Sequence, residues 1–250
     1  MDGSSRMNVT SQLDWNLIRQ MAAWSARAYT AATAVDIATD TQALVNVAGD
    51  QVIVAFRGSS SLRDFITDLE ARKEELLWSS DATAEVHAGF LRAFEAVDVK
   101  VVEQVRSALA GLAAPKLYIT GHSLGGALAI LCALELHRQK IPVAGVVTFG
   151  QPRVGNKTFA LIYNEALKDV TFAVVNQGDP VPLLPTLLMG YRDCGTELFI
   201  KNSGDVLTDP FIGFELVVDA LGAIAAWRNY RLGLLPNHFI RHYQERIQYL

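Results

Sequence analysis

The feature that most constrains the fold is a regular alternation of strand-like and helix-like segments in the middle of the chain. Apolar, β-prone runs alternate with helical stretches over residues 116–120, 124–138, 143–149, 157–168 and 170–175. Strands joined by helices at this spacing form right-handed crossovers, which place successive strands parallel to one another in a buried sheet. The sequence therefore predicts an α/β fold with a mainly parallel central sheet flanked by helices.

Further elements are expected on both sides of this alternation. Apolar residues at helical spacing predict a helix over 13–29, and Gly49-Asp50 between two β-prone runs predicts a hairpin over 43–56. We also expect helices over 62–77 and 90–109, an antiparallel edge strand over 197–201, and a helical tail from 211 that breaks near 233–236 and resumes to 250. No repeat, low-complexity segment or linker divides the chain, so one domain over 1–250 is expected.

Composition excludes several classes of protein. Hydrophobic residues make up 50% of the chain and charged residues 19%, which is typical of a globular protein. The formal net charge is −4 and no Lys/Arg cluster occurs, which argues against a nucleic-acid partner. Neither cysteine, Cys132 or Cys194, has metal-ligand spacing. The longest apolar stretch, 211–227, contains Glu215 and Asp219 and is too short and too charged for a transmembrane segment.

The first ten residues are polar and lack the apolar core of a secretory signal. A secreted protein that has lost its signal would begin in the same way, and so would a cytoplasmic protein. The sequence therefore leaves the compartment open, and it leaves the oligomeric state open as well.

One motif carries the chemistry of a nucleophile. Residues 121–125 read Gly-His-Ser-Leu-Gly, between a predicted strand and a predicted helix. A serine at such a sharp turn has a strained backbone and an exposed hydroxyl, and small residues two positions before and after it avoid a collision. The following helix N-terminus supplies N–H groups for a developing oxyanion. We therefore interpret Ser123 as a catalytic nucleophile.

A serine nucleophile needs a base and an acid. Where the serine sits on a strand-to-helix elbow of this kind, as in α/β-hydrolases, the acid and then the histidine follow it along the chain. Of five histidines, His87 precedes the serine, His122 adjoins it, and His137 lies about four turns along the next helix. His238, in a loop after Pro236-Asn237, is favoured over His242 as the base. Asp179 is favoured as the acid because it closes the strand that ends at Val175, whereas Asp169 precedes that strand, at the wrong end. Asp193 and Asp205 lie in later turns and are weaker alternatives.

Several segments in order resemble the class 3 (fungal-type) lipases of the α/β-hydrolase superfamily. The resemblance runs from about residue 52 to the C-terminus and rests on FRGSSS at 56–61, VHAGF at 86–90, GHSLGGALA at 121–129, TFGQPRVGN at 148–156, VN with DPVP over 175–182, and a His-x-x-x-x-Tyr ending at 238–243. This resemblance implies the α/β-hydrolase fold and a triad of Ser123, Asp179 and His238.

The resemblance also implies roles for residues around the triad. Ser59 and the backbone N–H of Leu124 correspond to the oxyanion-hole donors, and residues 61–78 correspond to a helical lid. Within that lid, residues 76–78 form a candidate lipid-facing patch. The chemistry needs no metal and no cofactor.

The implied function is hydrolysis of carboxylic esters, most simply as a triacylglycerol lipase acting on acylglycerols at a lipid–water interface. A phospholipase A1, or an esterase for short or aromatic acyl groups, would use the same triad. The apolar segment 205–235 could line an acyl pocket, form a second lid, touch a membrane, make a dimer contact or pack in the core. A catalytically silent interaction module would be expected to have lost Ser123, Asp179 or His238. A nucleotide-binding protein would need a Gly-rich phosphate loop, which 57–61 does not provide.

Overall fold

The computed structural model describes residues 13–59, 72–79, 81–210 and 236–250. Its centre is an eight-stranded sheet in the order β1-β2-β3-β6-β7-β9-β11-β12. The five strands from β3 to β11 are parallel, and the outer strands pair antiparallel. The strands are β1 (Ala34–Asp36), β2 (Thr41–Ala48), β3 (Gln51–Phe56), β6 (Lys116–His122), β7 (Gly145–Phe149), β9 (Thr171–Asn176), β11 (Thr196–Ile200) and β12 (Val206–Thr208). This confirms the mainly parallel sheet that the alternation predicts.

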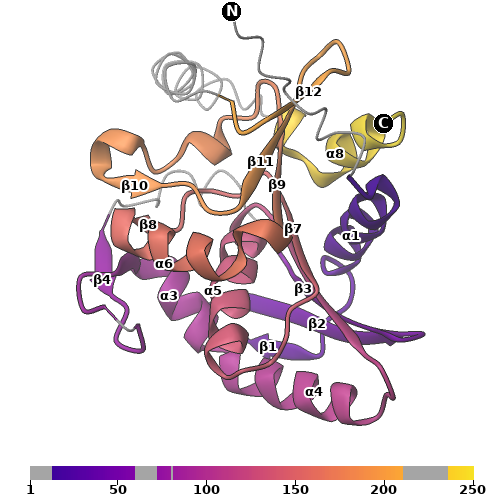
Figure 1. Cartoon of the computed structure of the whole chain (residues 1–250), viewed down its shortest axis with the longest axis vertical. Helices are drawn as coiled ribbons and strands as arrows, with labels where there is room; N and C mark the ends of the chain where they lie inside the picture. Colours follow the sequence, from indigo (N-terminus) through magenta and orange to yellow (C-terminus); the bar gives the residue numbers. More distant parts are fainter. Residues whose placement is uncertain (1–12, 60–71, 80, 211–235) are drawn as a thin grey trace, which may run out of the picture.

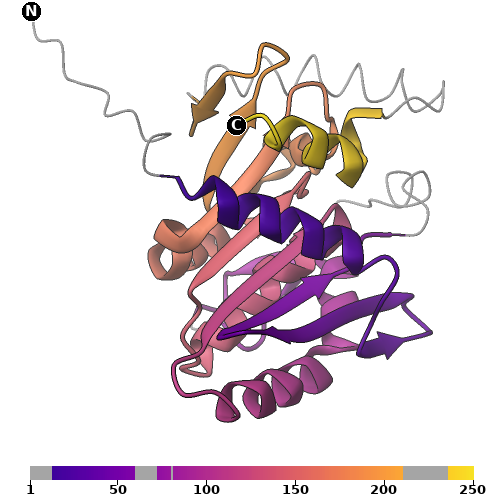
Figure 2. The same cartoon turned by 90° about the vertical axis from the view of Figure 1, so that its right-hand side faces the viewer.

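Helices cover both faces of the sheet (Figures 1 and 2). One face carries α1 (Trp15–Arg27) and α8 (Ile240–Ile247), and the other carries α3 (Ala88–Glu95), α4 (Asp98–Ala110), α5 (Leu124–Arg138) and α6 (Lys157–Leu167). Alternation along β3 explains the two layers, because Val52 and Val54 pack under the second group while Ile53 packs under α1. Every residue of β7 is buried, as expected for a central strand with helices on both sides.

Local sequence explains where several elements begin. The Asp14 carboxylate caps α1 by accepting the N–H groups of Asn16 and Leu17, each at 3.0 Å. The expected hairpin is present, with Gly49 at φ +64° between β2 and β3. Helix α5 begins directly after Ser123, where the motif predicts it.

The helix expected over 90–109 is instead two helices, α3 and α4. The chain leaves the helical conformation at Val97, and that side chain is 1% exposed in the core beneath the sheet. The break between α3 and α4 therefore coincides with the burial of Val97. The sequence contains no Gly or Pro at this point that would predict it.

The strand expected at the antiparallel edge was placed wrongly. Strand β11 pairs parallel with β9, and β12 forms the antiparallel edge beside it. Strand propensity does not specify direction, which depends on how the chain crosses the sheet.

The prediction of a helix over 62–77 is wrong for the residues of this range that the structure describes. Lys73–Glu75 form β4, which pairs with β5 (Glu85–His87) in a smaller sheet completed by β8 (Gly155–Asn156) and β10 (Tyr191–Arg192). Backbone pairing with β5 overrides the helical propensity of this charged run. Of the lid expected over 61–78, residues 61–71 lie outside the described part of the chain. Residues 73–75, which are described, form a strand and not a helix.

The predicted lipid-facing patch at 76–78 is also revised. Leu76 is buried and Trp78 packs partly against the core, so Leu77, at 86% exposure, is the one fully exposed side chain of the three. The apolar segment of the tail, 211–235, lies outside the described residues.

Four short 3-10 helices complete the described elements: η2 (Lys168–Val170), η3 (Val181–Leu183), η4 (Leu187–Met189) and η5 (Pro236–His238). Among the helices of the described ranges, none has the length and apolar character needed to cross a bilayer.

Candidate active site

Ser123 occupies a sharp turn between β6 and α5. Its backbone has φ +58° and ψ −129°, a conformation that a side-chain-bearing residue adopts only under strain. The flanking glycines make the turn possible. A Cβ atom on Gly121 would lie 2.1 Å from the Gly125 carbonyl oxygen, and one on Gly125 would lie 2.2 Å from that of Phe56. The motif spacing is therefore a steric requirement of this turn.

His238 and Asp179 form a buried pair. The His238 Nδ1 atom lies 2.8 Å from Asp179 Oδ2 and 3.0 Å from Oδ1, and the two residues are 1% and 4% exposed. A carboxylate only accepts hydrogen bonds, so Nδ1 carries the proton and Nε2 keeps a lone pair. This is the tautomer that a general base needs.

Asp179 is held by two further donors. The Val181 N–H donates to Oδ1 at 2.9 Å, and the Tyr243 hydroxyl donates to Oδ2. Tyr243 in turn accepts the N–H of Asn176 at 3.3 Å. Burial, followed by the Asp179 charge, raises the pKa of Tyr243 well above its ordinary value, so it remains a donor. Tyr243 has no predicted role from the sequence, although the His-x-x-x-x-Tyr ending at 238–243 contains it.

The other candidates lie elsewhere. His242 Nδ1 is 3.1 Å from Glu245 on the outer side of α8. Asp193 pairs with the Arg153 guanidinium at 2.8 Å, and Asp205 accepts from Ser203 in an exposed turn. Asp169 lies in η2, before β9. The structure thus brings only the favoured acid and the favoured histidine into contact.

Ser123 and His238 line one cavity of about 250 Å³, together with Tyr29, Ser59, His122, Phe239 and Ile240. The Ser123 Oγ and His238 Nε2 atoms are both buried, and neither has a hydrogen-bond partner among the described residues. Catalytic hydrogen bonds of this kind often form only when substrate is bound. Ser59, predicted as an oxyanion donor, is at this cavity. Leu124 is the first residue of α5, and its N–H belongs to the helix turn that lacks intrahelical partners.

His122 and Tyr29 are cavity residues to which the sequence analysis assigned no role. The Tyr29 hydroxyl lies 2.7 Å from His122 Nδ1, and His122 Nε2 lies 2.5 Å from the His238 carbonyl oxygen. Burial, and next the proximity of His238, lowers the pKa of His122 well below its ordinary value, so the ring is neutral near pH 7. Burial raises the pKa of Tyr29 to about 12.

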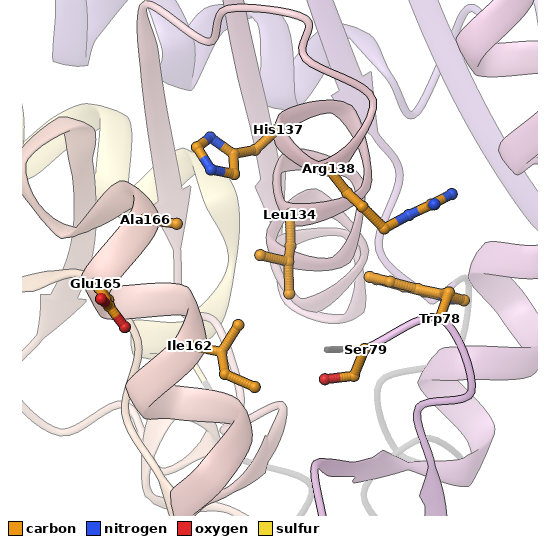
Figure 3. A pocket seen from close by; sticks show the side chains of 8 residues that line it. All are labelled: Trp78, Ser79, Leu134, His137, Arg138, Ile162, Glu165 and Ala166. Atoms are coloured by element: carbon orange, nitrogen blue, oxygen red, sulfur yellow. The ribbon is translucent and has the colours of Figure 1, made fainter. Parts of the chain in front are cut away.

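A larger cleft of about 540 Å³ lies away from these residues (Figure 3). Its lining comes from the C-terminal end of α5, from α6 and from the loop after β4, and includes Trp78, His137, Arg138 and Glu165. His137 is 14 residues beyond Ser123 along α5, roughly 20 Å away at the rise of an α-helix. Size alone therefore does not locate the site, because the smaller cavity holds Ser123 and His238, the predicted nucleophile and base.

Comparison with known proteins places this geometry in a family. The sequence matches the family described as Lipase (class 3) over residues 53–189. It is 34% identical to a secreted mono- and diacylglycerol lipase of Fusarium solani, over 61% of this chain and 44% of the relative. It is 35% identical to a lipase of Rhizomucor miehei, over 66% of this chain and 46% of the relative. The chain thus matches less than half the length of these relatives.

A solved structure supports the same relation. It is a triacylglycerol lipase whose catalytic centre is described as a serine protease triad, with 29% identity and a TM-score of 0.69 over 77% of this chain and 83% of that chain. The matched structures confirm the expected α/β-hydrolase fold. With the family match spanning more than half of its residues, including Ser123 and Asp179, this chain belongs to the class 3 lipase family.

Proposed function

We propose that this protein is a serine carboxylic-ester hydrolase, specifically a triacylglycerol lipase that acts on acylglycerols. The observation that carries the proposal is the shared cavity of Ser123 and His238, with the His238–Asp179 pair buried behind it. The names of the relatives, which are lipases, support the substrate class.

In the first step, Ser123 Oγ attacks the ester carbonyl carbon while His238 Nε2 takes the hydroxyl proton. Asp179 stabilises the resulting imidazolium through Nδ1. The tetrahedral oxyanion accepts hydrogen bonds from Ser59 and from the Leu124 N–H at the start of α5. The intermediate then collapses and the ester C–O bond breaks. His238 gives its proton to the alcohol oxygen, the alcohol departs, and the acyl group remains bound to Ser123 Oγ.

In the second step, His238 removes a proton from water, and the resulting hydroxide attacks the acyl carbonyl carbon. The same two donors hold the second oxyanion. Collapse of this intermediate breaks the bond to Oγ, His238 returns the proton to Ser123, and the fatty acid leaves. His238 carries every proton transfer in the cycle, and the two oxyanion donors only stabilise charge.

The test compares the wild-type protein with the Ser123→Ala variant. We expect wild type to hydrolyse p-nitrophenyl esters and emulsified triacylglycerol, and the variant to lose about 10⁴- to 10⁶-fold in kcat. Ser203→Ala, in an exposed turn, is the matched control and should keep full activity. An inactive wild type, or an active Ser123→Ala variant, would overturn the proposal.

The substrate panel separates the related activities. A series from acetate to palmitate distinguishes a short-chain esterase from a lipase, and phosphatidylcholine vesicles report phospholipase A1 activity. Mono- and diacylglycerols belong in the panel because a relative is named for them. Preference for emulsified triacylglycerol would support the assignment as a triacylglycerol lipase. Preference for another class of ester would contradict that assignment and identify the substrate class instead.

We further propose that the protein acts outside the cell. Two of the relatives are named secreted lipases, from Fusarium solani and Penicillium cyclopium. Fractionation of the native host tests this, since recovery of the protein in the cytoplasm alone would contradict it.

A further inference from the structure

Three polar groups, of which Tyr29 is partly buried and the other two are buried, form a chain of contacts beside the proposed triad. The Tyr29 hydroxyl lies 2.7 Å from His122 Nδ1, and His122 Nε2 lies 2.5 Å from the His238 carbonyl oxygen. The three residues come from the turn after α1, the end of β6 and η5, which are far apart in the sequence. All three line the cavity that contains Ser123.

The direction of each hydrogen bond follows from the chemistry of its acceptor. The His238 carbonyl oxygen can only accept, so His122 Nε2 carries the proton and donates it. In the neutral ring, His122 Nδ1 then has a lone pair and no proton. The Tyr29 hydroxyl must therefore donate to Nδ1, and it thereby selects the tautomer that can hold the His238 backbone.

The same hydroxyl lies against the backbone before Ser59. A Cβ atom on Gly58 would come 2.3 Å from the Tyr29 hydroxyl oxygen and 3.2 Å from Ser123 Cβ. Gly58 therefore lies between the Tyr29 hydroxyl and Ser123, where a side chain has no room. Tyr29 is in contact with the segment that leads to the proposed oxyanion donor and, through His122, with the segment that carries the base.

We infer that Tyr29 is a positioning residue for ester hydrolysis: its hydroxyl orients His122, which holds the main chain of His238 beside the cavity that His238 shares with Ser123. This inference rests on the proposed function, because it assigns a role in the same reaction. Tyr29 acts through His122 and takes no part in covalent chemistry. A purely structural tyrosine would act through its ring, whose centroid lies 6.0 Å from that of His122.

The kinetic test is Tyr29→Phe, which removes the hydroxyl and keeps the ring. We expect kcat on a p-nitrophenyl ester to fall about tenfold, the effect of one lost hydrogen bond, with KM unchanged. Tyr249→Phe, at an 86% exposed tyrosine, is the matched control and should leave both constants unchanged. An unchanged kcat in a folded Tyr29→Phe protein would overturn the inference.

A spectroscopic test does not depend on activity. NMR of protein labelled with ¹⁵N-histidine should show the His122 ring proton on Nε2 in wild type, and the Nδ1 resonance should shift in Tyr29→Phe. A His122 proton on Nδ1, or a resonance that Tyr29→Phe leaves in place, contradicts the contact chain. If wild type hydrolyses no ester, the proposed function fails, while the NMR result still decides whether Tyr29 orients His122.

Discussion

At the scale of single residues, His122 makes stability depend on pH. It is 4% exposed and its nearest titratable groups are Tyr29, His238 and Tyr243. Its pKa is lowered by burial, so the unfolded chain binds a proton more readily than the folded chain. The contribution of neutral His122 is therefore complete above about pH 6.5 and is lost as pH falls below that value toward the lowered pKa. We expect the urea midpoint of unfolding to fall over this range. The loss of unfolding free energy due to His122 is at most about 1.4 kcal/mol per pH unit.

The variant His122→Gln isolates that contribution. Its amide can still donate to the His238 carbonyl oxygen, but it does not titrate between pH 5 and 8. We expect the difference in stability between wild type and His122→Gln to shrink as the pH is lowered from 7.5 to 5. Parallel profiles for the two proteins would show that His122 does not contribute to the slope.

At the scale of elements, the contact between β3 and α5 sets the position of Ser123, the proposed nucleophile. A Cβ on Gly125 would lie 2.2 Å from the Phe56 carbonyl oxygen, which is backbone and has little room to move. We expect Gly125→Ala to lower the free energy of unfolding by about 1–3 kcal/mol or more, as overpacking does, and to displace Ser123. Urea denaturation and ester hydrolysis measure the two effects.

Gly111→Ala is the matched control for this prediction. Gly111 follows α4 at φ −81°, and the nearest atom to an added Cβ is 3.6 Å away. Alanine fits there without strain, so the stability should stay the same or rise slightly. Equal losses in the two variants would mean that the close approach at Gly125 is not what makes alanine unfavourable.

At the scale of the whole molecule, the two ends of the described chain pack together beside the site. Helices α1 and α8 lie side by side on one face of the sheet (Figure 2), where Ile18, Met21 and Ile247 share a core cluster. Ile247 is 1% exposed, so Ile247→Ala should lower stability by about 2–5 kcal/mol. Because α8 begins two residues after His238, we expect thermal loss of activity to accompany this destabilisation.

Tyr249→Ala serves as the comparison, since that side chain is 86% exposed just beyond α8. Its effect on the unfolding free energy should be within about 0.5 kcal/mol. If Ile247→Ala has an equally small effect, the packing of α8 on α1 is not a main source of stability for the segment that follows His238.

Much of the fold could be predicted because its determinants are local. The alternation over 116–175 predicted three of the parallel strands and both intervening helices, and the Gly49-Asp50 pair predicted the hairpin. The elbow at Ser123 could be read from five residues, because its steric demands involve immediate neighbours and the end of one adjacent strand. The favoured Asp179 and His238 also lie in contact in the structure.

The sequence by itself determined the elements whose backbone conformation depends on neighbouring residues: the elbow, the caps and the alternating strands and helices. Only the tertiary structure decided which distant groups meet. Strand β4 formed where a helix was expected because β5 offered backbone partners. Tyr29, His122 and Tyr243 acquired roles through contacts across more than 60 residues of chain. Such contacts depend on how the helices pack on the sheet, and no short stretch of sequence specifies that packing.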